Sequence, residues 1–440
     1  MKLIHWIFKI FVHIIHPAIG TVYSFIRFFV PKSFKGRFIF EQLNSADPYS
    51  KSFTLDNIKA KACFHVSSEG EFEQVHVLIE SYLDQQEKVE IIYSSGSLEL
   101  KLSRFKSRWG IENVRLLRLP LLTVTIWEPD LLRNWVSAKK IYFCRYDFYP
   151  HILDLANDRI SILLSAALKN KMSSIKHNPF AMFIYKYIYS RFAHIVASNE
   201  IEKKNLFNLG IADWKIHVFD YRIPSILKRL DSSRETIIEK SNLTGYINAL
   251  EQYEGRKIII GSAWEEDIEI ISNTQFISEL KNQSAHLCIA PHVHTGEVLN
   301  QIKKVIEQAG LGLKVISPEQ DYDIDLNEGQ VVLLLHRGIL CELYSFFNFA
   351  LVGCGFKKSV HSVLEPYLAG CCVSCGPRVH RSTEVDWIKS IEPTAISILS
   401  KPEGFYEHYS NCKRSHINYE DHLKHDQLTH FLVDFKERCI

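Results

Sequence analysis

A small-residue turn near residue 70 carries two carboxylates at the point where an apolar run meets an amphipathic stretch. The turn reads Ser67-Ser68-Glu69-Gly70-Glu71. A carboxylate at a helix start is usually a capping group that the helix dipole stabilises. A carboxylate held in a cleft with a suitable pKa is instead a general base that takes a proton from a substrate. The turn is compatible with both interpretations.

The elements that must position this turn follow from a rhythm of short apolar runs and longer amphipathic stretches. Continuous apolar runs of this length are typical of a parallel sheet that is covered on both faces. The pattern predicts two doubly wound α/β domains with a hinge near 220–230 and ligands at the carboxyl ends of the strands. We expect strands at 62–66, 89–93, 114–117, 140–144, 159–164, 257–261, 286–290, 314–316, 331–335, 350–352 and 371–374, and early helices at 71–83 and 97–109.

Length and composition exclude several other classes of protein. The chain has 440 residues, of which 46% are hydrophobic and 23% charged, so it is neither a disordered tail nor a small disulfide scaffold. The net charge of +2 hides an asymmetry. Residues 1–230 hold 32 Lys+Arg against 21 Asp+Glu, a charge of +11, and residues 231–440 hold 20 against 29, a charge of −9. A basic half indicates an anionic partner, although a solvated lysine-rich face is an equal alternative.

The ten cysteines show no regular framework. Several stand in apolar runs, where a thiol packs as a small hydrophobe, so we expect reduced thiols and a cytosolic body. Cys372 and Cys375 form a single CxxC without a second pair, and buried strand cysteines are a better interpretation than zinc ligands.

The first thirty-two residues carry Lys2, Lys9, Arg27 and Lys32 and no acidic residue. Their uncharged stretch, 10–26, is near the lower length limit of a membrane span, and two histidines, a proline and a glycine interrupt it. We expect an uncleaved N-terminal anchor that spans the membrane or lies on it, with the remainder cytoplasmic. A buried hydrophobic helix is the alternative.

Several motifs together resemble the 3-deoxy-D-manno-octulosonic acid (Kdo) transferases of lipopolysaccharide synthesis, which are membrane-associated enzymes of GT-B fold. The family's S-x-G-E turn is matched by residues 68–71, and its E-x-E-x-W-P-N element resembles residues 145–151. Its V-G-G-S…G-G-H-N-P-L-E-P…G-P-H pattern resembles residues 352–355, 361–366 and 376–378. The resemblance runs from about residue 1 to residue 390.

By that resemblance, Glu71 is the catalytic base, Asp147 supports acceptor binding, and Ser68 and Gly70 belong to the acceptor site. The resemblance also implies a set of donor-binding residues: Arg222, Ser262, Pro291, His292, Gly338, Ile339, Gly353, His361, Ser362 and Glu365. A helix start and loop donors can hold a phosphate, and Glu365 can bind ribose hydroxyls. This chain departs from the family at Arg145, His292 and Ser362, where the family has glutamate, arginine and asparagine.

The resemblance implies an inverting, metal-independent glycosyltransferase without a cofactor that moves Kdo, or a related keto-sugar, from its CMP-activated form to a lipid A-type acceptor. The site of action would be the cytoplasmic face of the inner membrane, and nucleic acid is not an expected partner. Two alternatives stay open: a GT-B transferase with another sugar-nucleotide donor, and a non-catalytic membrane-anchored protein that binds a sugar or lipid. The expected segments are an anchor at 1–32, an acceptor domain at 33–224, a nucleotide-sugar domain at 225–402 and a C-terminal segment at 403–440 that crosses back to the acceptor domain.

Overall fold

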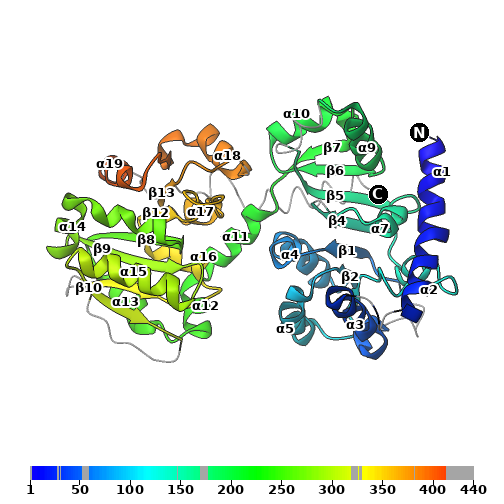
Figure 1. Cartoon of the computed structure of the whole chain (residues 1–440), viewed down its shortest axis with the longest axis horizontal. Coiled ribbons are helices and arrows are strands. Elements are labelled where there is room, and N and C mark those ends of the chain that lie inside the picture. The colour runs from blue at the N-terminus through cyan, green and yellow to red at the C-terminus, as the bar shows by residue number, and fades with distance from the viewer. Residues whose placement is uncertain are drawn as a thin grey trace. The chain divides into compact units, whose positions relative to one another are not determined.

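The chain forms two compact units, one ending at Ser225 and the other beginning at Ile226 (Figure 1). The computed structural model describes residues 2–26, 29, 31–51, 59–145, 147–168, 177–318, 326, 330–380 and 382–412. The four segments expected from the sequence stay a prediction. Two parts of the sequence predictions fall outside the described residues. They are Tyr146 of the second motif and residues 413–440 of the C-terminal segment.

The first unit is built on a seven-stranded sheet with the order β3-β2-β1-β4-β5-β6-β7, in which every neighbouring pair is parallel. The strands are β1 (Ala62–Val66), β2 (Val89–Tyr93), β3 (Val114–Arg118), β4 (Lys140–Cys144), β5 (Ile160–Ala166), β6 (His194–Ala197) and β7 (Ile216–Val218). The helices are α1 (Lys2–Ile10), α2 (His16–Ile26), α3 (Lys32–Ala46), α4 (Glu69–Leu83), α5 (Glu99–Trp109), α6 (Leu131–Trp135), α7 (Pro150–Leu155), α9 (Pro179–Ser190), α10 (Glu200–Asn208) and α11 (Arg222–Asp231), which runs on into the second unit.

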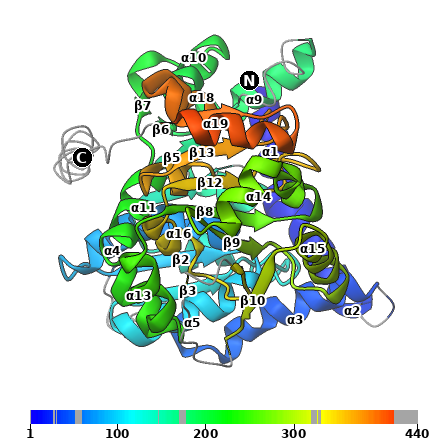
Figure 2. The ribbon, with the colours of Figure 1, turned by 90° about the vertical axis from the view of Figure 1, so that its left-hand side faces the viewer.

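The second unit repeats this architecture with the strand order β10-β11-β9-β8-β12-β13-β14, again with parallel neighbours (Figure 2). Its strands are β8 (Arg256–Ala263), β9 (Ala285–Pro291), β10 (Gly312–Ile316), β11 (Gln330–Leu334), β12 (Phe349–Val352), β13 (Cys372–Cys375) and β14 (Ile396–Ile398). Its helices are α12 (Ser233–Lys240), α13 (Thr244–Gln252), α14 (Thr274–Lys281), α15 (Gly296–Gln308), α16 (Leu340–Leu343), α17 (Leu364–Leu368), α18 (Thr383–Ile391) and α19 (Phe405–Asn411).

Burial on both faces explains why the central strands are apolar throughout. Every residue of β1, β2 and β4 is buried, including the polar ones. On one face of the second sheet, alternate strand residues pack against α14, α15 and α19 in a single cluster that includes Ile260 and Phe276. The two parallel, doubly wound sheets expected from the sequence are therefore confirmed. Three short strands, β6, β7 and β14, were not expected.

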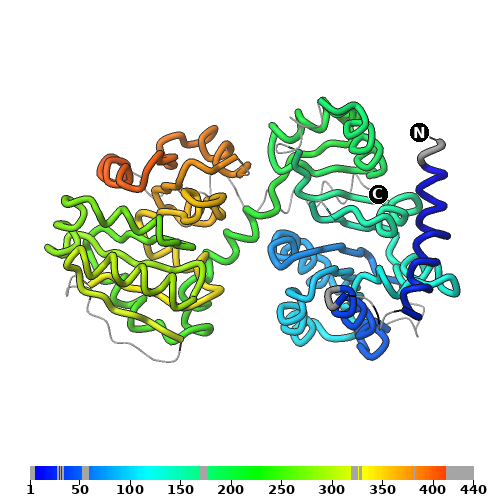
Figure 3. Tube along the Cα trace, viewed as in Figure 1, coloured from blue at the N-terminus to red at the C-terminus, as the bar shows by residue number. Residues whose placement is uncertain are grey.

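The N-terminal helices lie against the first unit along one face and form a nearly continuous rod with the π-helical turn Phe11–Ile15 (Figure 3). The two ring nitrogens of His13 each lie 3.2 Å from a carboxylate oxygen, one of Asp130 and one of Asp154. The hydroxyl of Thr21 accepts a hydrogen bond from the backbone N–H of Ile126 at 3.0 Å. The helix is therefore bound to its domain through polar contacts.

The stretch His5–Ile26 is long and apolar enough to cross a membrane by length and composition, with a mean hydropathy of 1.3 over its best window. Only 22% of that window is buried. Signal sequences and core helices of soluble proteins share the same length and composition. The large apolar side chains that this rod leaves exposed are Trp6, Ile7, Ile14, Ile15, Ile19, Val22, Phe25 and Ile26.

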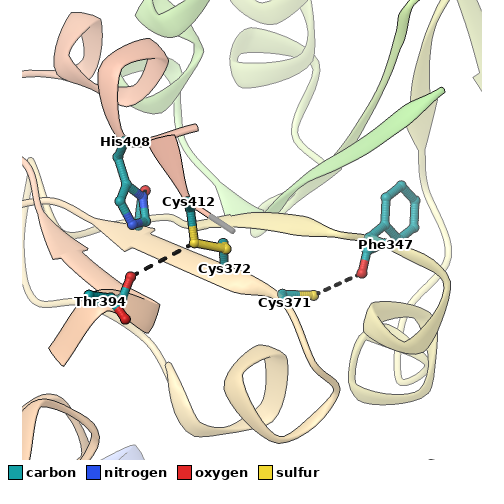
Figure 4. The surroundings of a disulfide bond; sticks show 7 residues. Phe347, Cys371, Cys372, Thr394, His408 and Cys412 are labelled. Atoms are coloured by element: carbon teal, nitrogen blue, oxygen red, sulfur yellow. Dashed lines mark hydrogen bonds between the residues drawn. A yellow bond between two sulfur atoms is a disulfide. The ribbon is translucent and has the colours of Figure 1, made fainter. Parts of the chain in front are cut away.

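A disulfide joins Cys372 on β13 to Cys412 just after α19, with 6.4 Å between the two Cα atoms (Figure 4). The expectation that all thiols are reduced was therefore wrong for this pair. The remaining cysteines described, among them Cys371 and Cys375, are free and buried as expected. The side chain of His408 on α19 also forms a hydrogen bond of 2.7 Å with Ser374, so the end of the described chain is bound to β13 of its own unit.

Candidate functional site

Each sheet has one point where its strand order reverses. In the first sheet this is the gap between β1 and β4, and in the second the gap between β8 and β12. Successive connections leave in opposite directions at such a point, so the loops diverge and leave room for a ligand at the carboxyl ends of the strands. The expected site residues follow these four strands: the turn with Glu71 follows β1, Asp147 follows β4, Ser262 lies at the end of β8 and Gly353 follows β12.

The turn after β1 holds Glu71 through the backbone. Ser68 caps helix α4, because its hydroxyl accepts the N–H of Glu71 at 3.3 Å. The carboxylate of Glu71 in turn accepts the N–H of Ser67 at 2.7 Å. Glu71 is 7% exposed, and this burial raises the pKa of its carboxyl to about 7. A base of that pKa suits proton abstraction near neutral pH.

The two other residues of the turn differ from Glu71 in burial and contacts. Glu69 is exposed on the first turn of α4, as expected for the variable position of the motif. Gly70 lies inside α4 without a positive φ, and a Cβ there would meet nothing within 4 Å, so the fold does not require a glycine at this position. The cap on Ser68 sets the position of Glu71 instead.

Asp147 and Arg145 follow β4 beside this turn. Asp147 is exposed, and its charge adds to the effect of burial in raising the pKa of Glu71, while Arg145 lowers it. Arg145 takes a φ of +61°, which is uncommon for a residue with a side chain. His65 on β1 is buried without a hydrogen bond at its Nε2. Burial lowers the pKa of His65 to about 4, so its ring is neutral beside the carboxylates.

The glycines of the second unit permit close backbone contacts at the carboxyl ends of β8 and β12. A Cβ on Gly353 would lie 2.3 Å from the carbonyl oxygen of Ser262, so no other residue fits there. Ser262 and Cys354 take φ values of +55° and +71°. The carboxylate of Asp267 accepts the N–H groups of Trp264 and Cys354, at 2.8 and 3.1 Å, and burial raises its pKa to about 6. Backbone strain of this kind clusters at ligand sites.

Two histidines among the expected donor-binding residues lie together at this edge of the sheet. The ring centroids of His292, after β9, and His361, before α17, are 4.4 Å apart. Trp264 stacks on His292 at 5.6 Å. The rings therefore come from three separate loops, and only their folding brings them into contact.

Glu365 begins helix α17. Burial raises the pKa of its carboxyl to about 7, against the lowering effect of Arg229. Arg229 itself forms a two-pronged ion pair with Glu342, at 3.0 and 2.8 Å. Ser362 donates a hydrogen bond of 3.2 Å to Glu384 on α18. The carboxylate of Glu365 thus lies in an acidic neighbourhood that one arginine balances.

The other expected donor residues are spread over both units. Arg222 belongs to the first unit, where its guanidinium binds Asp220 at 2.6 and 2.8 Å. Pro291 ends β9, Gly338 turns with a φ of +81°, and Ile339 is buried before α16. Within the described residues, no group of three or more His, Cys, Asp and Glu side chains could hold a metal ion.

Sequence reasoning missed Trp264, His65 and Asp267. Trp264 immediately follows Ala263 at the end of β8, a position where ligands bind in such sheets, and this was the signal that could have identified it. His65 and Asp267 gave no such signal, because only burial distinguishes them.

Residues 32–221 match the family model described as 3-deoxy-D-manno-octulosonic-acid transferase (kdotransferase). Over these residues, which are most of the first unit, the chain is similar to the Kdo transferase family. The 3-deoxy-D-manno-octulosonic acid transferase of Rickettsia prowazekii (strain Madrid E) is 22% identical over 272 residues, which are 61% of this chain and 54% of that protein. The chain therefore spans about half the length of this curated Kdo transferase.

Two solved structures match all or part of the chain. UDP-GlcNAc 2-epimerase from Neisseria meningitidis, bound to UDP-GlcNAc, matches 80% of this chain and 90% of its own, with 14% identity and a TM-score of 0.53. The C-terminal CMP-Kdo binding domain of WaaA from Acinetobacter baumannii matches 41% of this chain and 89% of its own, with 16% identity and a TM-score of 0.32. The first of these likenesses and the two seven-stranded parallel sheets confirm the expected GT-B architecture of two Rossmann-like domains.

Proposed function

We propose that this protein is a glycosyltransferase that transfers Kdo, or a related keto-sugar, from its CMP-activated form to a glycolipid of the lipid A type. The observation that carries the proposal is Glu71, a buried carboxylate with a pKa of about 7 at the switch point of a unit that matches the Kdo transferases. The curated relative is named for Kdo transfer, which supports this donor.

The chemistry assigns one role to each unit. The carboxylate of Glu71 takes the proton of an acceptor hydroxyl as that oxygen bonds to the anomeric carbon of the keto-sugar. The bond from that carbon to the phosphate oxygen breaks, and CMP leaves with the electron pair. Attack opposite the leaving group inverts the anomeric configuration. The loops after β8, β9 and β12 supply the donors that stabilise the leaving phosphate, without a metal ion.

A turnover assay tests the proposal. Purified protein is incubated with a lipid A precursor and radiolabelled CMP-Kdo, and in parallel with several UDP-sugars. Labelled glycolipid from CMP-Kdo supports the donor assignment. Product from a UDP-sugar alone would reassign the donor, and binding without any product would favour a non-catalytic sugar-binding protein.

We further propose that the rod of residues 2–26 lies in the interface of the inner membrane at its cytoplasmic face. One face of the rod is bound to the first unit through His13 and Thr21, and the apolar side chains on the rest are free to enter lipid. The basic charge of residues 1–230 is suited to anionic headgroups.

Sedimentation with vesicles of phosphatidylethanolamine and phosphatidylglycerol tests this placement. Trp6→Asp and Phe25→Asp should each weaken binding about tenfold or more, because burying one aromatic side chain contributes about 1.5–3 kcal/mol. Trp214→Asp is the matched control, since Trp214 is 68% exposed in the same unit but outside the rod. Equal losses in all three variants would contradict the proposal.

A further inference from the structure

The rings of Trp264, His292 and His361 form a stack at the carboxyl edge of the second sheet. Centroid distances are 5.6 Å between the first two rings and 4.4 Å between the two imidazoles, with interplanar angles near parallel, 29° and 30°. His292 is exposed, whereas His361 lies deeper. A ligand can therefore reach the ring of His292 from solvent, and the ring of His361 packs directly behind it.

Two polar atoms of this stack have no partner among the described residues. The Nε2 atom of His361 and the Nε1 atom of Trp264 are both buried without a hydrogen bond. A buried polar atom without a partner costs free energy, and an incoming ligand oxygen can supply the missing bond. The stack is consequently incomplete on its own.

The cations around the stack keep its imidazoles neutral. Burial, Arg337 and Lys358 all lower the pKa of His292, and burial and His292 lower the pKa of His361. Lys358 lies 5.2 Å from the Trp264 ring centroid. Burial and Arg337 also lower the pKa of His294 on the same loop. This edge is therefore cationic before either imidazole is charged.

The nearby carboxylates are engaged elsewhere. Glu265 and Glu266 both pair with Lys357, the latter at 3.1 Å. Asp267 accepts backbone N–H groups of its own turn and of Cys354. Glu384, which faces the loop after His361, accepts the N–H of Val363 at 2.9 Å. Within the described residues, no ion pair joins these carboxylates to either imidazole, and an anionic ligand could supply the negative charge.

We propose that the His292–His361 pair binds the anionic part of the nucleotide donor by taking up one proton from solvent. This inference rests on the proposed function, because it assumes that the second unit holds the donor. A neutral imidazole nitrogen gains an N–H that donates to a phosphate or carboxylate oxygen, in a charge-assisted hydrogen bond. Only one proton is taken up, since two charged rings at this spacing repel each other.

The direction of the pH dependence follows from this linkage. In the free protein the pair is neutral at neutral pH. A bound anion favours the charged ring and raises its pKa, so the complex binds more protons than the free protein. Donor affinity therefore rises as pH falls, by up to about tenfold per pH unit between the two pKa values.

Calorimetric titration with the methyl ester of CMP tests the inference, because this phosphodiester has no phosphate ionisation near neutral pH. Titrations at about pH 7.5 in buffers of different ionisation enthalpy give the number of protons taken up, and we expect a value between about 0.5 and 1. The dissociation constant should fall severalfold from about pH 8 to pH 6. Binding without proton uptake, or no binding at all, would overturn the inference.

Variants assign the proton to the pair. His292→Arg should abolish proton uptake and the pH dependence and, at about pH 7.5, should bind at least as tightly as wild type, since arginine is charged throughout. His361→Gln should weaken binding and reduce uptake. His177→Gln is the control, an exposed histidine of the first unit, and should leave both unchanged. Uptake that persists in both site variants overturns the inference, and thermal melts confirm that each variant is folded.

The turnover assay separates this inference from the proposed function. Proton-linked nucleotide binding without transfer of any sugar would contradict the transferase proposal. The histidine pair would still be a proton-linked nucleotide-binding site. Sugar transfer with pH-independent nucleotide binding would support the transferase proposal and contradict the proposed role of the histidine pair.

Discussion

Glu71 and Glu365 occupy corresponding places in the two units, each in the first turn of a helix beside a strand-order reversal. Burial raises the pKa of both carboxyls to about 7. Their surroundings differ. Glu71 accepts a backbone N–H, and its ionisation is opposed by Asp147 and favoured by Arg145. The ionisation of Glu365 is favoured by Arg229 and opposed by the two carboxylates of Glu384 and Glu342.

This difference separates two uses of a buried carboxylate. A carboxylate with a single hydrogen bond and an acidic neighbour takes a proton readily, which is what a general base requires. A carboxylate beside a cation, as Glu365 is beside Arg229, can accept hydrogen bonds from the hydroxyls of a ligand. Equal pKa values therefore do not imply equal roles, and contacts must decide between proton transfer and binding.

The largest expected effect tests Glu71. Glu71→Gln removes the proton acceptor and should lower turnover about 10²–10⁴-fold, while nucleotide affinity and thermal stability stay close to wild type. Glu69→Gln, on the same turn but exposed, should do little. The measurement is initial rate with radiolabelled donor. If both variants were equally mild, the assignment of the base would have to be abandoned.

A smaller effect should distinguish Glu365. Glu365→Gln should raise the KM for the donor about 10–100-fold, because a hydrogen bond to a charged group contributes about 1.5–3 kcal/mol, with little change in kcat. Steady-state kinetics over donor concentration separate the two constants. A fall in kcat at unchanged KM would show that both glutamates act on the reaction step and would break the comparison.

The pH profile should follow Glu71. The base must be ionised to act, so kcat at saturating donor should fall about tenfold per pH unit below a pKa of about 7. Saturating donor removes the opposite pH dependence that the histidine pair gives to donor binding. Replacement of Glu71 by Gln should abolish this limb of the profile, and a limb that survives would belong to another group.

The smallest effect concerns stability and should be confined to one unit. Cys412→Ser opens the disulfide to Cys372 and should cost about 2–4 kcal/mol in the free energy of unfolding, as expected for a loop of this length. Calorimetric melts should show the loss only in the transition of the second unit. The control is a melt of both proteins in reductant, in which the variant and the wild type should have the same free energy of unfolding.

The sequence predicted the central strands because their apolar runs are continuous: β1 and β2 begin and end where the pattern placed them. It missed β6, β7 and β14, which have three or four residues each and include polar ones. Strands of three or four residues, at or next to a sheet edge, are too short to show a recognisable hydrophobic pattern.

The candidate site was predictable where a motif is local and not where loops meet. Ser68 and Glu71 are three residues apart, so the helix cap that Ser68 forms with the N–H of Glu71 could be foreseen from the turn. Trp264, His292 and His361 come from separate loops, so their spacing along the chain does not predict that the three rings stack. The disulfide was missed for the same reason, since its cysteines are 40 residues apart.

The contacts that bind the N-terminal rod to the first unit bear on how the protein would search a membrane. A domain on a flexible tether tumbles and samples many orientations above the lipid. On the membrane placement that we propose, a domain fixed to an interfacial helix through His13 and Thr21 would keep one face toward the bilayer. Its remaining freedom would be lateral diffusion and rotation about the membrane normal, so its encounter with the proposed glycolipid acceptor would be a two-dimensional search.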